Sequence, residues 1–249
     1  MCIRDREAIV NFEDIGIVMS VRRHGESSGI LELITKDHGR HLGLVRGYQS
    51  KNNKSILQPG STINFNWRSR LSEHLGVFTF ELHTSRSLNL MKNKFAILVL
   101  QNLISHLRLL PEREKVPEIY NQTEEVLDRS HENYELVKKF ILWELLYLKE
   151  IGYGIDMSEC AVTKSKIDLR YISPKSGRAV TKEIGLPYKD KLFEIPEFIY
   201  GKKYTDRDDL LKGLLLTEFF LKRDVYMPLQ LKITSFRASL YKLINSFET

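Results

Sequence analysis

A stretch of the sequence without acidic residues is the first place where residue types point to a chemistry. No Asp or Glu occurs between Asp37 and Glu73, whereas the same window contains Arg40, Arg46, Lys51, Lys54, Arg68 and Arg70. Tyr48, Phe65 and Trp67 lie among them. Single-strand binders need cations that replace phosphate counterions and flat side chains on which bases stack. The window therefore predicts a nucleic-acid site, with Arg22 and Arg23 as additional contacts, and the net charge of +6 agrees with an acidic partner.

The same residues allow a plainer interpretation, in which the basic side chains cover a solvated loop face and the aromatic ones fill a core. The alternation in residues 61–67 places Ile63, Phe65 and Trp67 on one face of a strand. We therefore expect Phe65 and Trp67 in the core of the domain, and we expect the basic residues to contact nucleic acid.

Motifs for enzymatic or metal chemistry do not occur in the sequence. The seven histidines form neither HExxH nor HxxEH, and neither GxSxG nor GxxxxGK[ST] is present. The two cysteines, Cys2 and Cys160, cannot supply a four-thiolate site. We predict a protein that is not an enzyme and has no cofactor or metal, in which Cys160 is a lone buried thiol.

The first third of the chain has the pattern of short strands that would carry the basic window. Period-two or apolar runs predict strands over 15–21, 29–35, 40–46, 61–67 and 77–82, with a polar loop from Tyr48 to Gln58 between the third and the fourth. Five short strands with this long connection favour a small OB-type barrel, although an SH3-like barrel has a similar strand count.

The period becomes helical after Ser87. Apolar residues predict one helix over about 91–106, a central buried helix over 137–148, a helix over 210–222 opened by a capping box at Thr205, and a last helix over 229–247. The fold class is thus α+β: residues 12–86 form a five-stranded OB-fold β-barrel, and 87–249 form a helical domain with a turn-rich insert at about 154–196. We expect residues 1–11 to be a non-native or disordered leader.

The N-terminal residues carry a resemblance to a known family. Asp14-Ile-Gly-Ile-Val-Met-Ser-Val-Arg-Arg-His-Gly-Glu-Ser-Ser-Gly-Ile-Leu-Glu-Leu-Ile-Thr-Lys-Asp-His-Gly39 resembles the start of RecO proteins, and Val45-Arg-Gly47 and Leu57-Gln-Pro59 are similar to that family's turns. Residues 169–180 are similar to the form in alphaproteobacterial members. The resemblance extends over nearly the whole chain from about Phe12.

The resemblance implies an N-terminal OB-fold and a non-enzymatic function in recombinational DNA repair. It implies binding of single- and double-stranded DNA, annealing of complementary strands, and partnership with RecR and SSB that helps to load RecA. A cytoplasmic, nucleoid-associated protein without membrane contact is expected. Many members carry a four-cysteine zinc site in the insert, but here Thr163 stands where a CxxC partner of Cys160 would lie. We therefore expect no zinc.

Two other functions stay open, namely a metal-assisted nuclease acting on DNA and a scaffold that does not bind DNA. A nuclease needs clustered carboxylates, which the basic window lacks. The resemblance also implies a site for the acidic C-terminal tail of SSB. We expect Leu214, Leu215, Phe219 and Leu240 to form its walls and Lys222, Arg223, Lys232 and Arg237 its rim, with Arg223 and Arg237 as the preferred contacts.

Overall fold

The computed structural model describes residues 10–71, 73–201 and 205–246. The chain divides into two compact units, Met1–Asp128 and Arg129–Thr249. The first unit contains the barrel and also three helices that follow it, so it continues beyond residue 86, where the sequence placed the domain boundary. Residues 1–9, which include Cys2 and most of the expected leader, lie outside the described residues.

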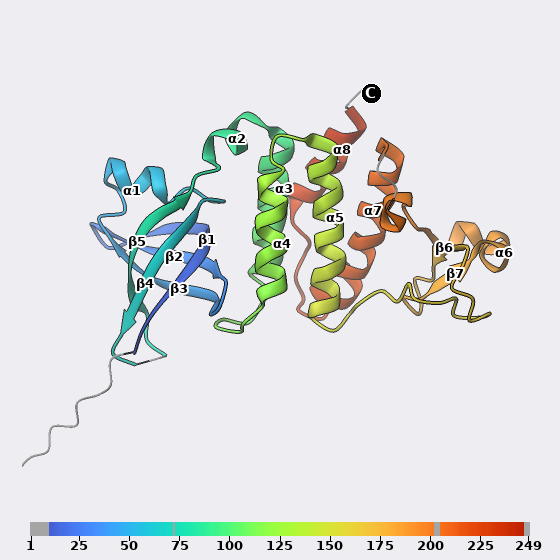
Figure 1. Ribbon diagram of the computed structural model, residues 1–249, viewed down its shortest axis with the longest axis horizontal. Helices are drawn as coiled ribbons and strands as arrows, with labels where there is room; N and C mark the ends of the chain where they lie inside the picture. The colour runs from blue at the N-terminus through green and yellow to red at the C-terminus, as the bar shows by residue number, and fades with distance from the viewer. Residues whose placement is uncertain (1–9, 72, 202–204, 247–249) are drawn as a thin grey trace, which may run out of the picture. The chain divides into compact units, whose positions relative to one another are not determined.

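The first unit begins with five strands that pair in a ring. The pairing order is β1-β2-β3-β5-β4, and β4 pairs in turn with β1. All pairs are antiparallel except β3 with β5, a parallel contact of only two residue pairs that completes the ring. This order agrees with the expected OB-type fold. The elements are β1 (Val10–His24), β2 (Ser28–Thr35), β3 (Gly39–Arg46), α1 (Lys51–Ile56), β4 (Thr62–Ser69) and β5 (Gly76–Thr84) (Figure 1).

β1 is long because it pairs with two neighbouring strands, β4 and β2. Its first half, from Val10 to Ile17, pairs with β4, and its second half, from Gly16 to His24, pairs with β2. A bulge between Val18 and Ser20, within the half that pairs with β2, bends the strand around the barrel. Val10 and Asn11, which the sequence assigned to a leader, lie in this strand.

The barrel core is aromatic and aliphatic, as the alternation in β4 predicted. Phe65 is 4% exposed and Trp67 1% exposed, which confirms that both rings belong to the core. They pack with Val18, Leu31, Leu33, Val45, Leu57, Ile63 and Phe78. Gly76 allows β5 to approach the indole, since a Cβ there would lie 2.4 Å from Cε2 of Trp67. The core thus uses the two aromatic residues that could otherwise have stacked on bases.

Three helices complete the first unit, namely α2 (Ser87–Lys92), α3 (Lys94–Leu107) and α4 (Pro117–Asp128). The sequence predicted a single helix over 91–106. Asn93 divides it, because its extended backbone ends α2 and its side chain accepts the Phe95 N–H to cap α3. α3 and α4 lie side by side (Figure 1). α4 was not predicted from the sequence.

The second unit is built on α5 (Asn133–Glu150), which packs against α7 (Arg207–Phe220). Val137, Phe140, Ile141, Trp143 and Leu148 are all buried, so the expectation of a central buried helix is confirmed. The π-helical turn η3 (Leu221–Tyr226) continues α7, and α8 (Ser235–Ser246) follows.

The ends of the last two helices differ from the prediction. α7 is capped by Asp206, whose carboxylate accepts the Asp209 N–H at 2.8 Å, and not by Thr205. α8 begins at Ser235 and not near Leu229, because Met227–Gln230 are turns and Gln230 has a left-handed φ of 56°. No described helix is long and apolar enough to span a membrane.

The insert folds as a small sheet within the second unit. Its strands β6 (Leu169–Ile172), β7 (Ala179–Thr181) and β8 (Phe193–Glu194) have the order β7-β6-β8. The remaining turns are α6 (Lys182–Gly185), η1 (Leu186–Lys191) and η2 (Glu197–Tyr200). Leu169, Tyr171 and Ile172 are buried, so apolar packing holds this region together.

Candidate nucleic-acid interface

Five of the eight predicted contact residues gather at one end of the barrel. His24 at the end of β1 pairs with Ser28 of β2, and Ser28 pairs with Arg46 of β3. Arg46 therefore lies at the same end of the sheet as the end of β1, with β2 between them. Asn53 of α1 donates to the carbonyl oxygens of Arg46 and Gly47, at 3.4 and 3.0 Å, which fixes α1 beside this end. We call the resulting group the α1 cluster: Arg22, Arg23, Arg46, Lys51 and Lys54.

The α1 cluster presents its charge to solvent. All five side chains belong to exposed residues. In the described part of the chain, no carboxylate lies within ion-pair distance of any of them, although Glu26 is in the neighbouring β1–β2 turn. Free exposed cations that follow one end of an OB-type barrel can track a phosphate backbone.

Arg68 and Arg70 form a second, separate group. They line a cavity of about 400 Å³ with His74 at the β4–β5 turn. Arg68 pairs with Asn11 in the β4–β1 register, so this group lies at the opposite end of β1 from Arg22 and Arg23. The sequence predicted one site, whereas the structure shows two groups of cations. His74 was not predicted as a contact residue.

Arg40 belongs to neither group, because it is bound to carboxylates. It donates to Glu32 at 3.1 Å and to Glu112 at 3.3 Å, and its side chain is 15% exposed. Glu32 also accepts two bonds from Arg108 and one from Ser20. Burial raises the pKa of Glu32, but the bonds from Arg108, Ser20 and Arg40 outweigh burial and hold the pKa below its usual value. Arg40 thus stabilises the fold and does not offer a free charge.

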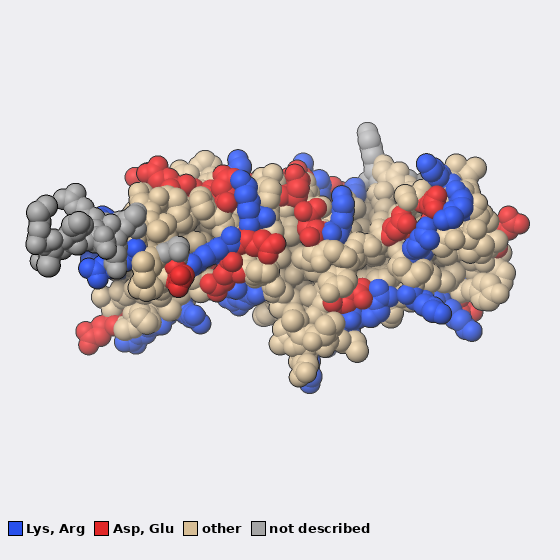
Figure 2. Space-filling view, turned by 90° about the horizontal axis from the view of Figure 1, so that it is seen from below, with Lys and Arg blue, Asp and Glu red and all other residues tan. Residues whose placement is uncertain are grey.

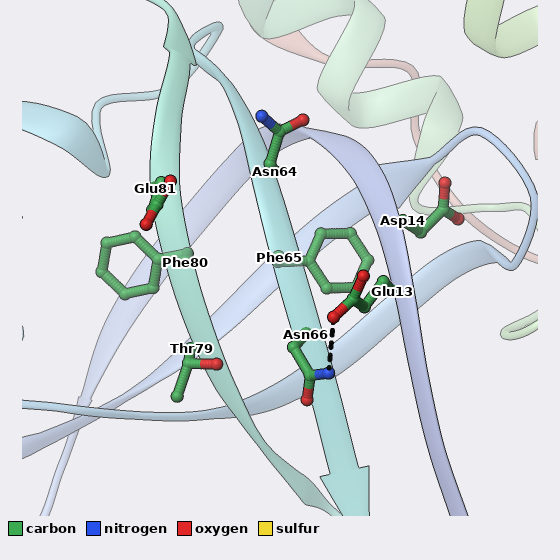
Figure 3. Close-up of a pocket in the computed structure, with 8 residues that line it drawn as sticks. All are labelled: Glu13, Asp14, Asn64, Phe65, Asn66, Thr79, Phe80 and Glu81. Carbon is green, nitrogen blue, oxygen red and sulfur yellow. Dashed lines mark hydrogen bonds between the residues drawn. The ribbon is translucent and has the colours of Figure 1, made fainter.

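One face of the barrel is acidic. A cavity of about 610 Å³ is lined by Glu13, Asp14, Asn64, Phe65, Asn66, Thr79, Phe80 and Glu81 of β1, β4 and β5 (Figure 3). The Asn66 amide donates to Glu13 at 3.4 Å across it. Carboxylates repel phosphates, so this face does not suit a DNA backbone. Figure 2 likewise shows acidic and basic side chains interspersed on the face in view, so a nucleic-acid path depends on local groups of cations.

The two arginines predicted to meet the SSB tail already have partners inside the protein. Arg237 is 1% exposed and pairs with the fully buried Glu144, and it also donates to the Leu214 carbonyl and to Thr217. The expectation that Arg237 lies on a cationic rim is therefore wrong, because it is part of the helical core. Leu214 and Leu240, expected as groove walls, are fully buried in the same core.

Arg223 is partly exposed but is also engaged. Its guanidinium donates to both carboxylate oxygens of Asp224, at 2.6 and 2.7 Å, and to the Pro174 carbonyl. It lies 4.6 Å from the ring centroid of Phe220. Lys222 pairs with Glu218. A contact between Arg223 and a partner's carboxylate stays a prediction.

The insert does not fit a zinc ion. Cys160 is buried, and its Sγ accepts the N–H groups of Thr163 and Thr181, both at 3.5 Å. Burial raises the pKa of the Cys160 thiol, but hydrogen bonds with the side chain of Thr163 and with the backbone of Thr163, Thr181 and Val162 outweigh burial and lower the pKa to about 6. Among the described residues, no group of three or more His, Cys, Asp or Glu side chains is placed to hold a metal. A tetrahedral structural site would need three more ligands than this thiol.

Comparison with known proteins agrees with the barrel and the helical region. The family model for the N-terminal domain of recombination protein O matches residues 9–86, and the model for its C-terminal domain matches residues 102–232. The chain belongs to the RecO family. Proteins named DNA repair protein RecO are similar over 88% of this chain: 42% identical in Rhizobium etli (strain CIAT 652) and 46% in Chelativorans sp. (strain BNC1), covering 86% and 89% of those proteins. Membership in this family indicates a role in DNA repair and recombination.

Proposed function

We propose that the protein binds single- and double-stranded DNA through the α1 cluster and anneals complementary strands without making or breaking bonds. The observation that carries this proposal is the set of five exposed cations without carboxylate partners at one end of an OB-type barrel, in a chain of the RecO family. Annealing requires that phosphate repulsion be neutralised while the bases stay free to pair, which an open basic surface can do.

We further propose that the protein has the partners and the cellular location that its family suggests. The protein would act as a mediator with RecR and SSB, assist the loading of RecA indirectly, and work in the cytoplasm in association with the nucleoid. Of the two preferred contacts for the acidic SSB tail, Arg223 stays accessible, with a side chain 37% exposed, whereas Arg237 is buried. Titration of a labelled tail peptide against Arg223→Ala tests this contact, and equal affinity of variant and wild type would place the tail elsewhere.

A salt series separates DNA binding from the scaffold alternative. For single strands, each phosphate neutralised contributes about −0.7 to the slope of log affinity against log salt, so engagement of the whole α1 cluster predicts a slope of roughly −3.5. A slope near zero, or the absence of binding, would favour the scaffold. Incubation of labelled DNA with magnesium tests the nuclease alternative, and intact DNA is expected.

A further inference from the structure

A small cavity next to the α1 cluster has walls that suit a flat, partly apolar ligand. It measures about 360 Å³ and is lined by Ser20, Val21, Tyr48, Lys54, Leu57, Gln58 and Pro59. We call it the Tyr48 pocket. Its volume is near the lower end of the range typical of small-ligand sites. Four of its residues are apolar or aromatic, and the other three bring a hydroxyl, an ammonium and an amide.

Tyr48 is held in position within this pocket. It packs beside Gly29 of β2, where a Cβ would lie only 2.9 Å from Cγ of Tyr48, so glycine is needed for the ring to lie against the strand. The hydroxyl of Tyr48 accepts a hydrogen bond from Gln49 at 3.0 Å. The residue is half-buried and packs against the barrel core. An aromatic ring fixed in this way can stack on a ligand without losing conformational freedom on binding.

The surroundings of the pocket are cationic. Lys54 lines it directly, and the Gln58 amide donates to the Lys54 carbonyl at 2.6 Å, which joins the two residues. Arg23 is the register partner of Gly29, so it lies on the same face of the sheet as the glycine against which Tyr48 packs. The ligand that suits an aromatic and apolar slot within a cluster of free cations is a flat group attached to a polyanion.

We propose that the Tyr48 pocket takes one unstacked nucleobase of a single strand whose phosphates lie on the α1 cluster. This inference rests on the proposed DNA binding and adds to it a preference for single strands over duplex DNA. Bases in a duplex are paired and stacked on one another, so they cannot enter the pocket, whereas those of a single strand can. Stacking on an aromatic ring accepts every base, so the pocket favours single strands without selecting a sequence.

Abasic oligonucleotides test this proposal on the wild-type protein. A single strand and an abasic strand of the same length carry the same phosphates and differ only in their bases. The normal strand should bind between about 5-fold and about 150-fold more tightly, which is the range for one base stacked on an aromatic ring. A single strand containing 5-iodouracil should crosslink to Tyr48 on irradiation, as mapped by mass spectrometry.

Two substitutions then assign the effect to Tyr48. Tyr48→Leu keeps apolar packing against the barrel but removes the ring, and it should bind normal and abasic strands equally. Tyr48→Phe keeps the ring and should retain the preference. Both variants should bind duplex DNA as the wild type does, which also shows that they are folded. If Tyr48→Leu does not fold, the abasic comparison and the crosslink decide the matter alone.

The outcomes separate this inference from the proposed function. Equal wild-type affinity for normal and abasic strands, or a preference that Tyr48→Leu retains, would overturn the Tyr48 pocket while DNA binding by charge still stands. Failure of the wild type to bind any of these DNAs would overturn the proposed function itself.

Discussion

The barrel and the C-terminal helices both contain arginines that the sequence marks as binding residues, but the two regions place them in opposite surroundings. Arg46 of the barrel is exposed and has no carboxylate within ion-pair distance in the described chain, whereas Arg237 of α8 is buried against Glu144. The sequence around Arg46 contains no acidic residue from Asp37 to Glu73. Arg237 meets a carboxylate that lies 93 positions earlier in the chain.

The difference shows that a basic residue in a sequence is an available charge only where folding brings no acid to it. Arg40 makes the same point within the basic window, since Glu32 and Glu112 approach it from other elements. The α1 cluster is thus the larger of the two groups in which predicted cations are exposed and have no carboxylate within ion-pair distance among the described residues, the other being Arg68 and Arg70. Four variants test this contrast, from the largest expected effect to the smallest.

Arg237→Ala should destabilise the helical unit by about 3–5 kcal/mol, because it removes the one guanidinium that pairs with the buried Glu144 carboxylate in the described chain and leaves that negative charge uncompensated. Urea unfolding followed by circular dichroism measures the loss. The double variant Glu144→Leu/Arg237→Met removes both charges and should recover much of it. A folded Arg237→Ala protein of wild-type stability would mean that Arg237 is not part of the core.

Reversal of charge in the α1 cluster should weaken DNA binding without affecting the fold. Arg46→Glu/Lys51→Glu should lower affinity for all sequences by at least roughly tenfold and make the salt slope less steep by about 1.4, since two phosphate contacts are lost. The matched control is Arg68→Glu/Arg70→Glu in the β4–β5 group, which should have the smaller effect. Equal losses of DNA affinity in the two double variants would indicate that the α1 cluster and the β4–β5 group act as one continuous site.

Glu32→Gln should lower the free energy of unfolding by about 1–3 kcal/mol at neutral pH, because charged hydrogen bonds from Arg40, Arg108 and Ser20 are lost. The folded-state pKa of Glu32 is below its usual value, so its contribution is complete above the unfolded-state pKa and disappears as pH falls through the folded-state value. Urea midpoints for variant and wild type should therefore converge in acid. A difference that persists there would assign the effect to packing.

Glu26→Gln should have the smallest effect, an increase in DNA affinity of up to about twofold, since it removes an exposed carboxylate beside the α1 cluster. Filter binding at low salt measures it. Glu81→Gln, on the acidic face of the barrel, should leave affinity unchanged. A larger gain in DNA affinity from Glu81→Gln than from Glu26→Gln would indicate that DNA binds at the acidic face of the barrel and not at the α1 cluster.

Patterns that act within one element were readable from the sequence. The alternation of Ile63, Phe65 and Trp67 located β4 and its buried face, because one side of a barrel strand must be apolar. The stripe from Val137 to Leu148 located α5 in the same way. The strand count and the family resemblance together predicted the correct class of fold.

Features that depend on contacts between distant elements were not readable. The buried Glu144–Arg237 pair joins α5 to α8, and nothing near either residue indicates it. The Tyr48 pocket likewise needs Val21 of β1 and Gln58 and Pro59 of the connection between α1 and β4 around one ring. The sequence indicated its charge and its tyrosine, but not the cavity.

The most direct test of the central claim is annealing of two complementary oligonucleotides, followed by fluorescence quenching without ATP. The wild-type protein is expected to accelerate annealing in proportion to its concentration, and Arg46→Glu/Lys51→Glu should lose most of that acceleration while unfolding at the same urea concentration. Acceleration that is equal in the two proteins, or absent from both, would contradict annealing through the α1 cluster.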